Sequence, residues 1–316
     1  MTTIFNSTDV PADLLQALKA DFDVVDVPAG TESDLAAYGA PTAWILDGDT
    51  KIDAGVLAQL PSLKLVSNYG VGYDNIIVDD ATAAGVIISN TPGVLDNAVA
   101  EVTLGLILGI ARGIVWSDRW IRNGNWGPEW APLTGDVHGA TLGIVGMGRI
   151  GRRLAELVAP LGMRVLYHNR KPNPEIDNSG LAHYAEWETM LAESDFVSLH
   201  TPLTERTRGF FTAEDFALMK PSAYLINTAR GAVVDEAALL DALTSNRIAG
   251  AALDVFVDEP LRKDSPLLQL DNVVLTPHIG SATVHTRRAM IELAVANVAA
   301  GARGEAPQTP VNNIVG

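Results

Sequence analysis

Three stretches of the chain each place one side chain suited to acid–base or anion chemistry directly after an apolar run. Arg230 lies in NTARGAVVDE, Glu259 in AALDVFVDEP and His278 in TPHIGSAT. If the preceding runs are strands of one parallel sheet, all three side chains open onto its carboxyl edge, where ligands bind. Reduction of a carbonyl by hydride needs a proton donor and a cation for an adjacent carboxylate, and this trio supplies both. Taken singly, each residue is more often an ordinary surface or core residue, so the ordered set carries the inference.

A glycine motif indicates the hydride carrier. In TLGIVGMGRIGRRLAELV, a G-x-G-x-x-G follows an apolar run and opens a helical pattern. Such glycines permit a tight turn, close approach of a pyrophosphate and close packing of helix on strand, and the helix N-terminus favours the anion. The alternative is an ordinary glycine-rich turn. We expect a dinucleotide here, bound by Gly146, Gly148, Arg149, Ile150 and Gly151.

The type of dinucleotide is predicted by VLYHNRK at 165–171. A NAD-binding unit normally has an acid about 20 residues past the glycines, bonded to the ribose 2′-hydroxyl. Here no carboxylate repels a 2′-phosphate; Arg170 offers it a planar fork of donors, and Asn169 adds an amide. The sequence therefore favours NADP, with NADPH preferred over NADH, against the alternative of a solvated basic turn.

Two α/β series are expected to position these residues. In the first, β-rich runs at 24–27, 43–46, 64–68 and 86–90 alternate with helical patterns such as 11–20, which is typical of βαβ units. Residues 98–122 predict one long helix, and 123–140 a loop rich in Gly, Pro and Trp. A doubly wound sheet is predicted from six further runs, at 141–146, 164–168, 196–200, 223–227, 250–256 and 273–278, before a last helix at 283–300.

Length and charge limit the kinds of partner. A chain of 316 residues suggests two domains with a cleft between them. The net charge of −16 opposes nucleic acid and anionic membranes, so an anionic substrate needs local arginines. The absence of cysteine excludes disulfides and thiolate chemistry, and we expect no metal site. The apolar stretch 102–111 is shorter than the roughly 20 residues of a membrane span, and the N-terminus shows no secretory signal, so a cytoplasmic protein is expected.

Together these stretches resemble the D-isomer-specific 2-hydroxyacid dehydrogenase family. The matching stretches, in the family's order from about residue 66 to 300, are VSNYGVGYDNI, NTPGVLDNAVAEVTLGLIL, GIVGMGRIGRRLA, HTPLTERTRGF, LINTARGAVVDEAAL, GAALDVFVDEP and NVVLTPHIGSAT. The resemblance implies two doubly wound parallel-sheet α/β domains, with a Rossmann dinucleotide-binding domain at 99–285 inserted in a discontinuous flavodoxin-like substrate domain at 1–98 and 286–316. It also implies a homodimer through the cofactor domain, served by the 102–111 helix and the Trp-containing loop.

The resemblance also assigns roles to residues. His278 would be the general acid in reduction and the base in oxidation, with its imidazole held by Glu259. Arg230 would bind the substrate's carboxylate and carbonyl oxygen. The remaining contacts it implies are the N–H groups of Val71 and Gly72 on the same carboxylate, Asp254 at the nicotinamide amide, and Pro202, Thr207 and Gly280 along the cofactor. His285 departs from the pattern, because many relatives carry an acid there.

The expected function is NADPH-dependent reduction of small 2-oxoacids, glyoxylate and hydroxypyruvate, to D-2-hydroxy acids. Closure of the domains would exclude water during transfer. Reductases of bulkier 2-oxoacids such as phenylpyruvate or hydroxyphenylpyruvate share nearly every motif, so they stay an alternative. A dinucleotide-sensing, corepressor-like scaffold is an alternative of another class. The substrate's side-chain pocket has five unranked candidates: Asp47, Gly48, Tyr69, Leu95 and Trp130.

Overall fold

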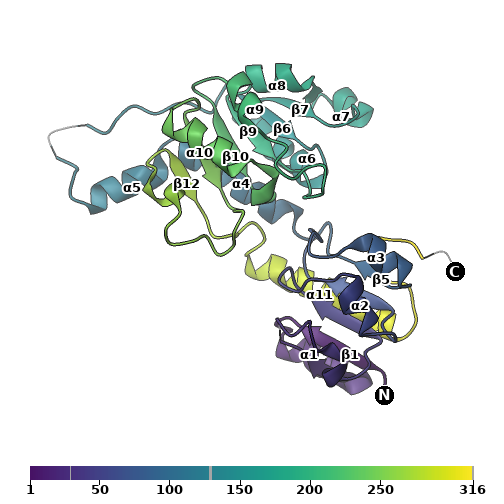
Figure 1. The fold of residues 1–316 in the computed structure, drawn as a ribbon. Coiled ribbons are helices and arrows are strands. Elements are labelled where there is room, and N and C mark those ends of the chain that lie inside the picture. The colour runs from purple at the N-terminus through teal and green to yellow at the C-terminus, as the bar shows by residue number, and fades with distance from the viewer. Residues whose placement is uncertain (29, 128–129, 315–316) are drawn as a thin grey trace. The chain divides into compact units, whose positions relative to one another are not determined.

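The computed structural model describes residues 1–28, 30–127 and 130–314, and the chain divides into two compact units (Figure 1). One unit comprises Met1–Leu95 and Thr283–Gly316, and the other comprises Asp96–Ala282. The boundaries expected from the sequence fall at 98 and 286. Pro128 and Glu129 of the expected loop lie outside the described residues, as do Ala29, Val315 and Gly316 of the expected substrate domain.

The discontinuous unit contains a parallel sheet of five strands in the order β2-β1-β3-β4-β5. The strands are β1 (Thr3–Ser7), β2 (Asp23–Asp26), β3 (Ala43–Leu46), β4 (Leu65–Asn68) and β5 (Ile87–Ser89). Its helices are α1 (Ala12–Asp21), α2 (Ala54–Ala58), α3 (Val78–Ala83) and α11 (Val284–Ala302), with a 3₁₀ turn at Leu35–Tyr38. This strand order is that of flavodoxin-like sheets. The sequence analysis did not predict β1, whose apolar residues Ile4 and Phe5 are fully buried.

Both faces of this sheet are covered, so its inner strands β3 and β4 are buried at every residue. One face carries a cluster that includes Val56 and Leu57 of α2. The other packs against α1 and α11, which contributes Ile291 and Val298. The approach of α11 is close, since a Cβ added at Gly301 would lie 2.5 Å from the Cβ of Leu65. The N-terminal sheet is therefore completed by a helix from the far end of the chain.

The second unit contains a parallel sheet of seven strands in the order β12-β11-β10-β9-β6-β7-β8. The strands are β6 (Thr141–Val145), β7 (Arg164–His168), β8 (His183–Tyr184), β9 (Phe196–Leu199), β10 (Tyr224–Asn227), β11 (Gly250–Leu253) and β12 (Val273–Leu275). The first six in chain order follow the Rossmann arrangement. The predicted fold class, two doubly wound parallel-sheet α/β domains, is confirmed. The sequence reading missed β8, because two residues show no periodicity.

Helices cover both faces of this second sheet. They are α4 (Asp96–Ala111), α5 (Ile114–Arg122), α6 (Arg149–Val158), α7 (Pro174–Ser179), α8 (Trp187–Glu193), α9 (Ala213–Leu218) and α10 (Glu236–Thr244), with 3₁₀ turns at Ala159–Leu161, Gly231–Val233 and Pro266–Gln269. One core cluster includes residues of α8, α9 and α10, and the other includes residues of α4 and α6.

The single long helix predicted over 98–122 is wrong. The chain forms α4 and α5, which meet at an angle of 60°. Gly113 precedes α5 with φ of 58°, a left-handed conformation that ends the first helix. Among the described residues, no single helix is long and apolar enough to cross a membrane, although the bent α4–α5 pair passes that test on length and composition.

Candidate active site

The glycine loop between β6 and α6 has an open face at a helix N-terminus. A Cβ at Gly146 would lie 2.7 Å from the carbonyl oxygen of His200, and one at Gly151 would lie 2.6 Å from the carbonyl oxygen of Gly146. At Gly148, by contrast, a Cβ would meet nothing within 4 Å, and no side chain caps the helix that begins at Arg149. Packing explains the first and third glycines. The space at Gly148 fits the close approach of a dinucleotide's pyrophosphate.

Asn169 follows β7, and the glycine loop orients its amide. The Oδ1 atom of Asn169 accepts a hydrogen bond from the N–H of Met147 at 2.8 Å. Because a backbone N–H can only donate, the amide oxygen is committed to the loop and the NH2 group stays available as a donor. The next residue, Arg170, is exposed. This turn therefore offers donors where a carboxylate would offer acceptors.

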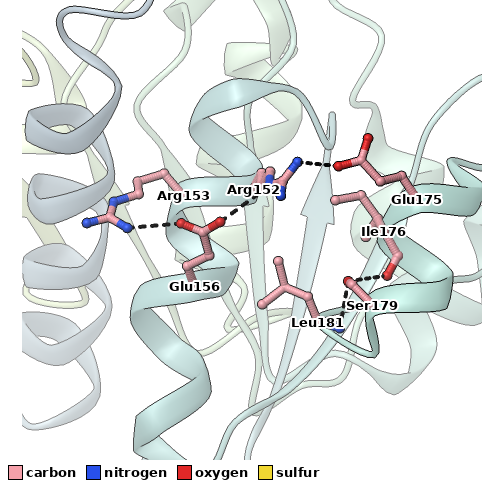
Figure 2. Close-up of polar contacts among 7 residues, drawn as sticks. All are labelled: Arg152, Arg153, Glu156, Glu175, Ile176, Ser179 and Leu181. Carbon is pink, nitrogen blue, oxygen red and sulfur yellow. Dashed lines mark hydrogen bonds and ion pairs between the residues drawn. The ribbon is translucent and has the colours of Figure 1, made fainter.

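Ion pairs tie the segment after Arg170 back to α6 (Figure 2). The Nη1 atom of Arg152 lies 2.8 Å from Oε1 of Glu175, which belongs to α7. On α6 itself, Glu156 pairs with Arg152 at 3.3 Å and with Arg153 at 2.9 Å. Exposed pairs of this kind contribute little to stability. The pair of Arg152 with Glu175 links α7 to the helix whose N-terminus carries the glycines.

Arg230 follows β10 on a turn that side-chain hydrogen bonds hold in place. The Nδ2 group of Asn227 donates to the carbonyl of Arg230 at 2.9 Å, and its Oδ1 accepts from the N–H of Ala229 at 3.0 Å. A Cβ at Gly231 would overlap the carbonyl group of Phe256. The turn with Arg230 is therefore packed against the segment that leads to Glu259.

Glu259 and His278 are in direct contact. The Nδ1 atom of His278 lies 2.6 Å from Oε2 of Glu259, and Oε1 of Glu259 accepts from the N–H of Phe256 at 2.9 Å. Burial alone would raise the pKa of Glu259, but the hydrogen bonds from His278 and Phe256, together with the charge of Arg230, hold that pKa below its ordinary value. Glu259 is therefore a carboxylate at neutral pH, and Nδ1 of His278 donates to it. The Nε2 atom of His278 remains for exchange with another group.

The backbone at His278 is unusual, and Asp254 holds it. His278 has φ of 52°, which residues other than glycine rarely adopt. Its N–H donates to the carbonyl of Asp254 at 2.9 Å. The buried carboxylate of Asp254 accepts from the hydroxyl of Thr276 at 2.6 Å and from the N–H groups of Ile279 and Gly280, both at 2.8 Å. Asp254 thus anchors the turn around His278, a role that the sequence reading missed; its predicted cofactor contact, and that of Gly280, stay predictions.

The loop after β9 contains the other two residues expected along the cofactor. The hydroxyl of Thr207 donates to the carbonyl of Pro202 at 2.6 Å and accepts from the N–H of Thr204 at 2.8 Å. Thr207 therefore sets the shape of this loop. Contacts of Pro202 and Thr207 with a cofactor stay predictions.

Val71 and Gly72 follow β4 in the discontinuous unit, in a loop where the carbonyl groups and the N–H groups of these two residues differ in their hydrogen bonding. Within the described ranges, the N–H groups of Val71 and Gly72 donate to no acceptor. Their carbonyls are occupied: that of Val71 accepts from Nδ2 of Asn90 at 2.8 Å, and that of Gly72 accepts from Nδ2 of Asn68 at 2.7 Å. Adjacent N–H groups without protein acceptors are suited to an anion such as a carboxylate.

The candidates for a side-chain pocket lie in different environments. The guanidinium of Arg287 lies 5.7 Å from the centre of the Tyr69 ring, Leu95 is buried, and Trp130 is 91% exposed. Asp47 is partly buried, which raises the pKa of its carboxyl.

The described residues include no group of three or more His, Cys, Asp or Glu side chains that could hold a metal ion. His285 is exposed on α11.

The sequence reading also missed three buried asparagines that shape the loops of the site. Asn68, Asn90 and Asn227 are each at most 8% exposed. Asn68 and Asn227 are the last residues of β4 and β10, and Asn90 directly follows β5, in LVSN, YLIN and IISN. An amide at the end of a buried strand can bond the backbone of the loop that follows. That recurrence was the available signal.

Comparison with known proteins shows which family profile and which enzymes this chain is similar to. The profile of the D-isomer specific 2-hydroxyacid dehydrogenase, NAD binding domain, matches residues 104–280. The chain is 47% identical over 271 residues to a glyoxylate reductase of Thermococcus litoralis, and this match covers 84% of this chain and 82% of the relative. It is 43% identical over 312 residues to glyoxylate/hydroxypyruvate reductase B of Shigella boydii, covering 96% and 95% of the two chains.

A solved structure is similar over nearly the whole chain. It is that of an NADPH-dependent glyoxylate/hydroxypyruvate reductase from Sinorhizobium meliloti in complex with NADP and malonate. The two chains are 34% identical, with a TM-score of 0.89, and the match covers 98% of this chain and 96% of the other.

Proposed function

This chain belongs to the D-isomer specific 2-hydroxyacid dehydrogenase family of NAD(P)-dependent oxidoreductases, and we propose that it uses NADPH to reduce small 2-oxoacids to D-2-hydroxy acids. Glyoxylate and hydroxypyruvate are the proposed substrates, as the names of the similar reductases support. The observation that carries the reaction type is the 2.6 Å contact between His278 and Glu259.

Dinucleotide binding is assigned to the glycine loop and the turn after β7. The open face at Gly148 fits the pyrophosphate, and Asn169 and Arg170 would hold the 2′-phosphate through donors alone. The bound, reduced nicotinamide supplies the hydride.

His278 supplies the proton in reduction. With Nδ1–H donated to the Glu259 carboxylate, the protonated imidazole presents Nε2–H to the carbonyl oxygen of the substrate. As that oxygen gains negative charge, the proton moves to it from Nε2, and the neutral imidazole then takes up a proton from water. In the oxidation direction, Nε2 accepts the hydroxyl proton. Glu259 keeps the ring oriented and stabilises its charged form.

The substrate's carboxylate needs positive partners, because the net charge of the chain is −16. We assign this contact to the guanidinium of Arg230, which would also polarise the carbonyl oxygen, and to the N–H groups of Val71 and Gly72. The backbone of Arg230 sits on a turn fixed by Asn227, and its Nη1 group donates to the carbonyl of Ala229 at 2.8 Å.

Initial rates with NADPH and with NADH against glyoxylate, hydroxypyruvate, pyruvate and phenylpyruvate test the proposal. Fast NADPH oxidation with the first two substrates is the expected result. Preference for phenylpyruvate would change the proposed substrate from a small 2-oxoacid to a bulky one and would leave the proposed reaction type unchanged. Absence of turnover with all four, alongside tight dinucleotide binding, would contradict the proposed reaction.

We further propose a homodimer formed through the dinucleotide-binding unit. Exposed apolar side chains gather on α5 and in the loop after it, among them Ile121, Trp126 and Leu133. By contrast, α4 buries Leu106 and Ile107 in the core of its own unit. The absence of nucleic acid and membrane partners, and a cytoplasmic location, stay predictions.

A further inference from the structure

The carbonyl groups of the loop with Val71 and Gly72 accept hydrogen bonds from two amide side chains and one backbone N–H. The carbonyl of Gly70 accepts from the N–H of Thr91 at 3.0 Å, and that of Val71 accepts from Nδ2 of Asn90 at 2.8 Å. The carbonyl of Gly72 accepts from Nδ2 of Asn68 at 2.7 Å. Three successive carbonyl groups therefore have partners within the protein.

Peptide planarity converts these contacts into an orientation of the N–H groups. The carbonyl of one residue and the N–H of the next belong to one rigid plane and point in opposite directions. Asn90, by fixing the carbonyl of Val71, fixes the N–H of Gly72. Thr91, by fixing the carbonyl of Gly70, does the same for the N–H of Val71.

Gly72 makes this restraint necessary. A flip of the peptide between Val71 and Gly72 changes ψ of the first residue and φ of the second, and glycine accepts nearly any φ. The flipped peptide would turn a carbonyl oxygen toward the place of the N–H. An anion would then meet a negative dipole end instead of a positive one. The Asn90 hydrogen bond opposes that flip.

Both asparagines are themselves held. The amide of Asn75 donates to the carbonyls of Asp47 at 3.2 Å and Thr50 at 2.8 Å, and it reaches Oδ1 of Asn68 at 3.5 Å. The loop after β3 is thereby joined to the loop after β4. On the other side, the hydroxyl of Thr309 donates to the carbonyl of Asn90 at 2.6 Å, so the C-terminal tail fixes the backbone of Asn90.

We propose that Asn90, with Asn68, is a positioning residue that gives this chain its selectivity for carboxylate-bearing carbonyl compounds. Asn90 acts by holding the N–H of Gly72 toward the anion and preventing a peptide flip. Asn68 assists at the N–H of Val71, because its Nδ2 group also donates to the carbonyl of Gly70 at 3.4 Å. This inference rests on the proposed reduction of 2-oxoacids and names two residues that would set the carboxylate contact without touching the substrate.

The experiment compares Asn90→Asp and Asn90→Leu with the wild type. Both replacements are close to Asn in size, and neither can donate to the carbonyl of Val71. The kcat/KM for glyoxylate is expected to fall about ten-fold or more, mainly through KM, because a contact with an ionised group is weakened. The kcat/KM for methyl glyoxylate, which has no carboxylate, and the Kd for NADPH are expected to stay unchanged.

The matched control is Asn312→Leu. Asn312 is an amide of the same unit that bonds the backbone at Val86 and Ile88, away from the loop. Its replacement is expected to lower stability and leave the ratio of glyoxylate to methyl glyoxylate unchanged. An Asn90 variant with the wild-type ratio, or with equal losses on both substrates, would overturn the proposal.

Binding of oxalate, measured by calorimetry on the whole protein with NADPH present, separates this inference from the proposed function. A ten-fold weaker Kd for oxalate in both Asn90 variants supports the positioning role, and an unchanged Kd refutes it. Wild-type protein that binds oxalate but reduces no 2-oxoacid would contradict the proposed reaction alone.

Discussion

The side-chain oxygen of Asn169 accepts a 2.8 Å hydrogen bond from the N–H of Met147, so the glycine loop itself decides that the NH2 end of this amide is the one available for the proposed contact with a ribose. An aspartate at this position would keep the bond through one oxygen and present its other oxygen where Asn169 presents NH2. Together with the proposed contact of Arg170, the proposed preference between the two dinucleotides therefore depends on a donor at this atom of Asn169 where an aspartate would place an acceptor.

Asn169→Asp is expected to move the cofactor preference from NADPH toward NADH. The change removes a donor and adds a charge that repels a 2′-phosphate, which is worth on the order of 1.5 to 3 kcal/mol, or roughly ten- to a hundred-fold in kcat/KM. Steady-state rates with both dinucleotides measure it. Asn173→Asp is the control, because the side chain of Asn173 accepts from the N–H of Glu175 as the cap of α7 and an aspartate serves equally well there. Equal preferences in the two variants would refute the assignment.

Gly148→Ala is expected to fold normally and to bind NADPH at least about ten-fold more weakly. A Cβ at Gly148 meets no protein atom within 4 Å, so its cost appears only when a dinucleotide occupies that space. Fluorescence titration and thermal unfolding measure the two effects. Gly105→Ala serves as the control: this exposed helical glycine also has open space, and alanine there is expected to add about 0.5 to 1 kcal/mol of stability without changing the Kd. Tight NADPH binding by Gly148→Ala would place the pyrophosphate elsewhere.

His278→Ala is expected to lower kcat about 10²- to 10⁴-fold while NADPH binding persists, since it removes the proposed proton donor. Glu259→Gln is expected to have a smaller effect, because glutamine keeps a polar partner for Nδ1 but removes the charge that stabilises the imidazolium. Single-turnover rates and NADPH titration separate chemistry from binding. His285→Ala, at an exposed position on the following helix, should behave as wild type. Wild-type turnover by His278→Ala would remove that residue from the mechanism.

His200 is expected to make the fold acid-sensitive between pH 6.5 and about 4. Desolvation lowers the pKa of His200 from 6.5 to about 4, so below pH 6.5 the unfolded chain binds a proton that the folded chain does not. The free energy of unfolding should therefore fall as pH falls through this window, and the loss should level off below about pH 4. Urea unfolding at pH 7 and pH 4.5 should show a smaller loss for His200→Gln than for wild type. His183→Gln, at an exposed position, should follow the wild type; identical losses in both variants would contradict the prediction.

Replacing Ile121 and Trp126 by Glu is expected to convert the proposed homodimer into monomers. Both side chains are exposed in the described unit, and burying a carboxylate in an apolar contact is unfavourable. Sedimentation velocity of the double variant measures the change. A matched double variant, Ile77→Glu with Val257→Glu, replaces two exposed apolar residues that belong neither to α5 nor to the loop after it, and should remain dimeric. A monomeric wild type, or a dimeric Ile121/Trp126 variant, would refute the proposed contact.

The sequence by itself determined the two α/β series, the glycine motif and the trio of Arg230, Glu259 and His278. These are local features: strands buried on both faces must be apolar runs, and a phosphate-binding turn needs glycines at set intervals. Residues placed directly after such strands share a sheet edge wherever the strands are parallel. For the same reason a position of Glu259 and His278 at one edge was foreseeable, whereas their direct contact was expected only from the family resemblance.

Only the tertiary structure decided how these residues are held. The break at Gly113, the two-residue strand β8, and the positive φ of His278 depend on packing that no short pattern encodes. The direction of the Asn169 amide and the hydrogen bond from Asn90 to the carbonyl of Val71 depend on partners that are distant in the chain. A side-chain amide can donate or accept at either end, and the partner that the fold brings to it selects one of them.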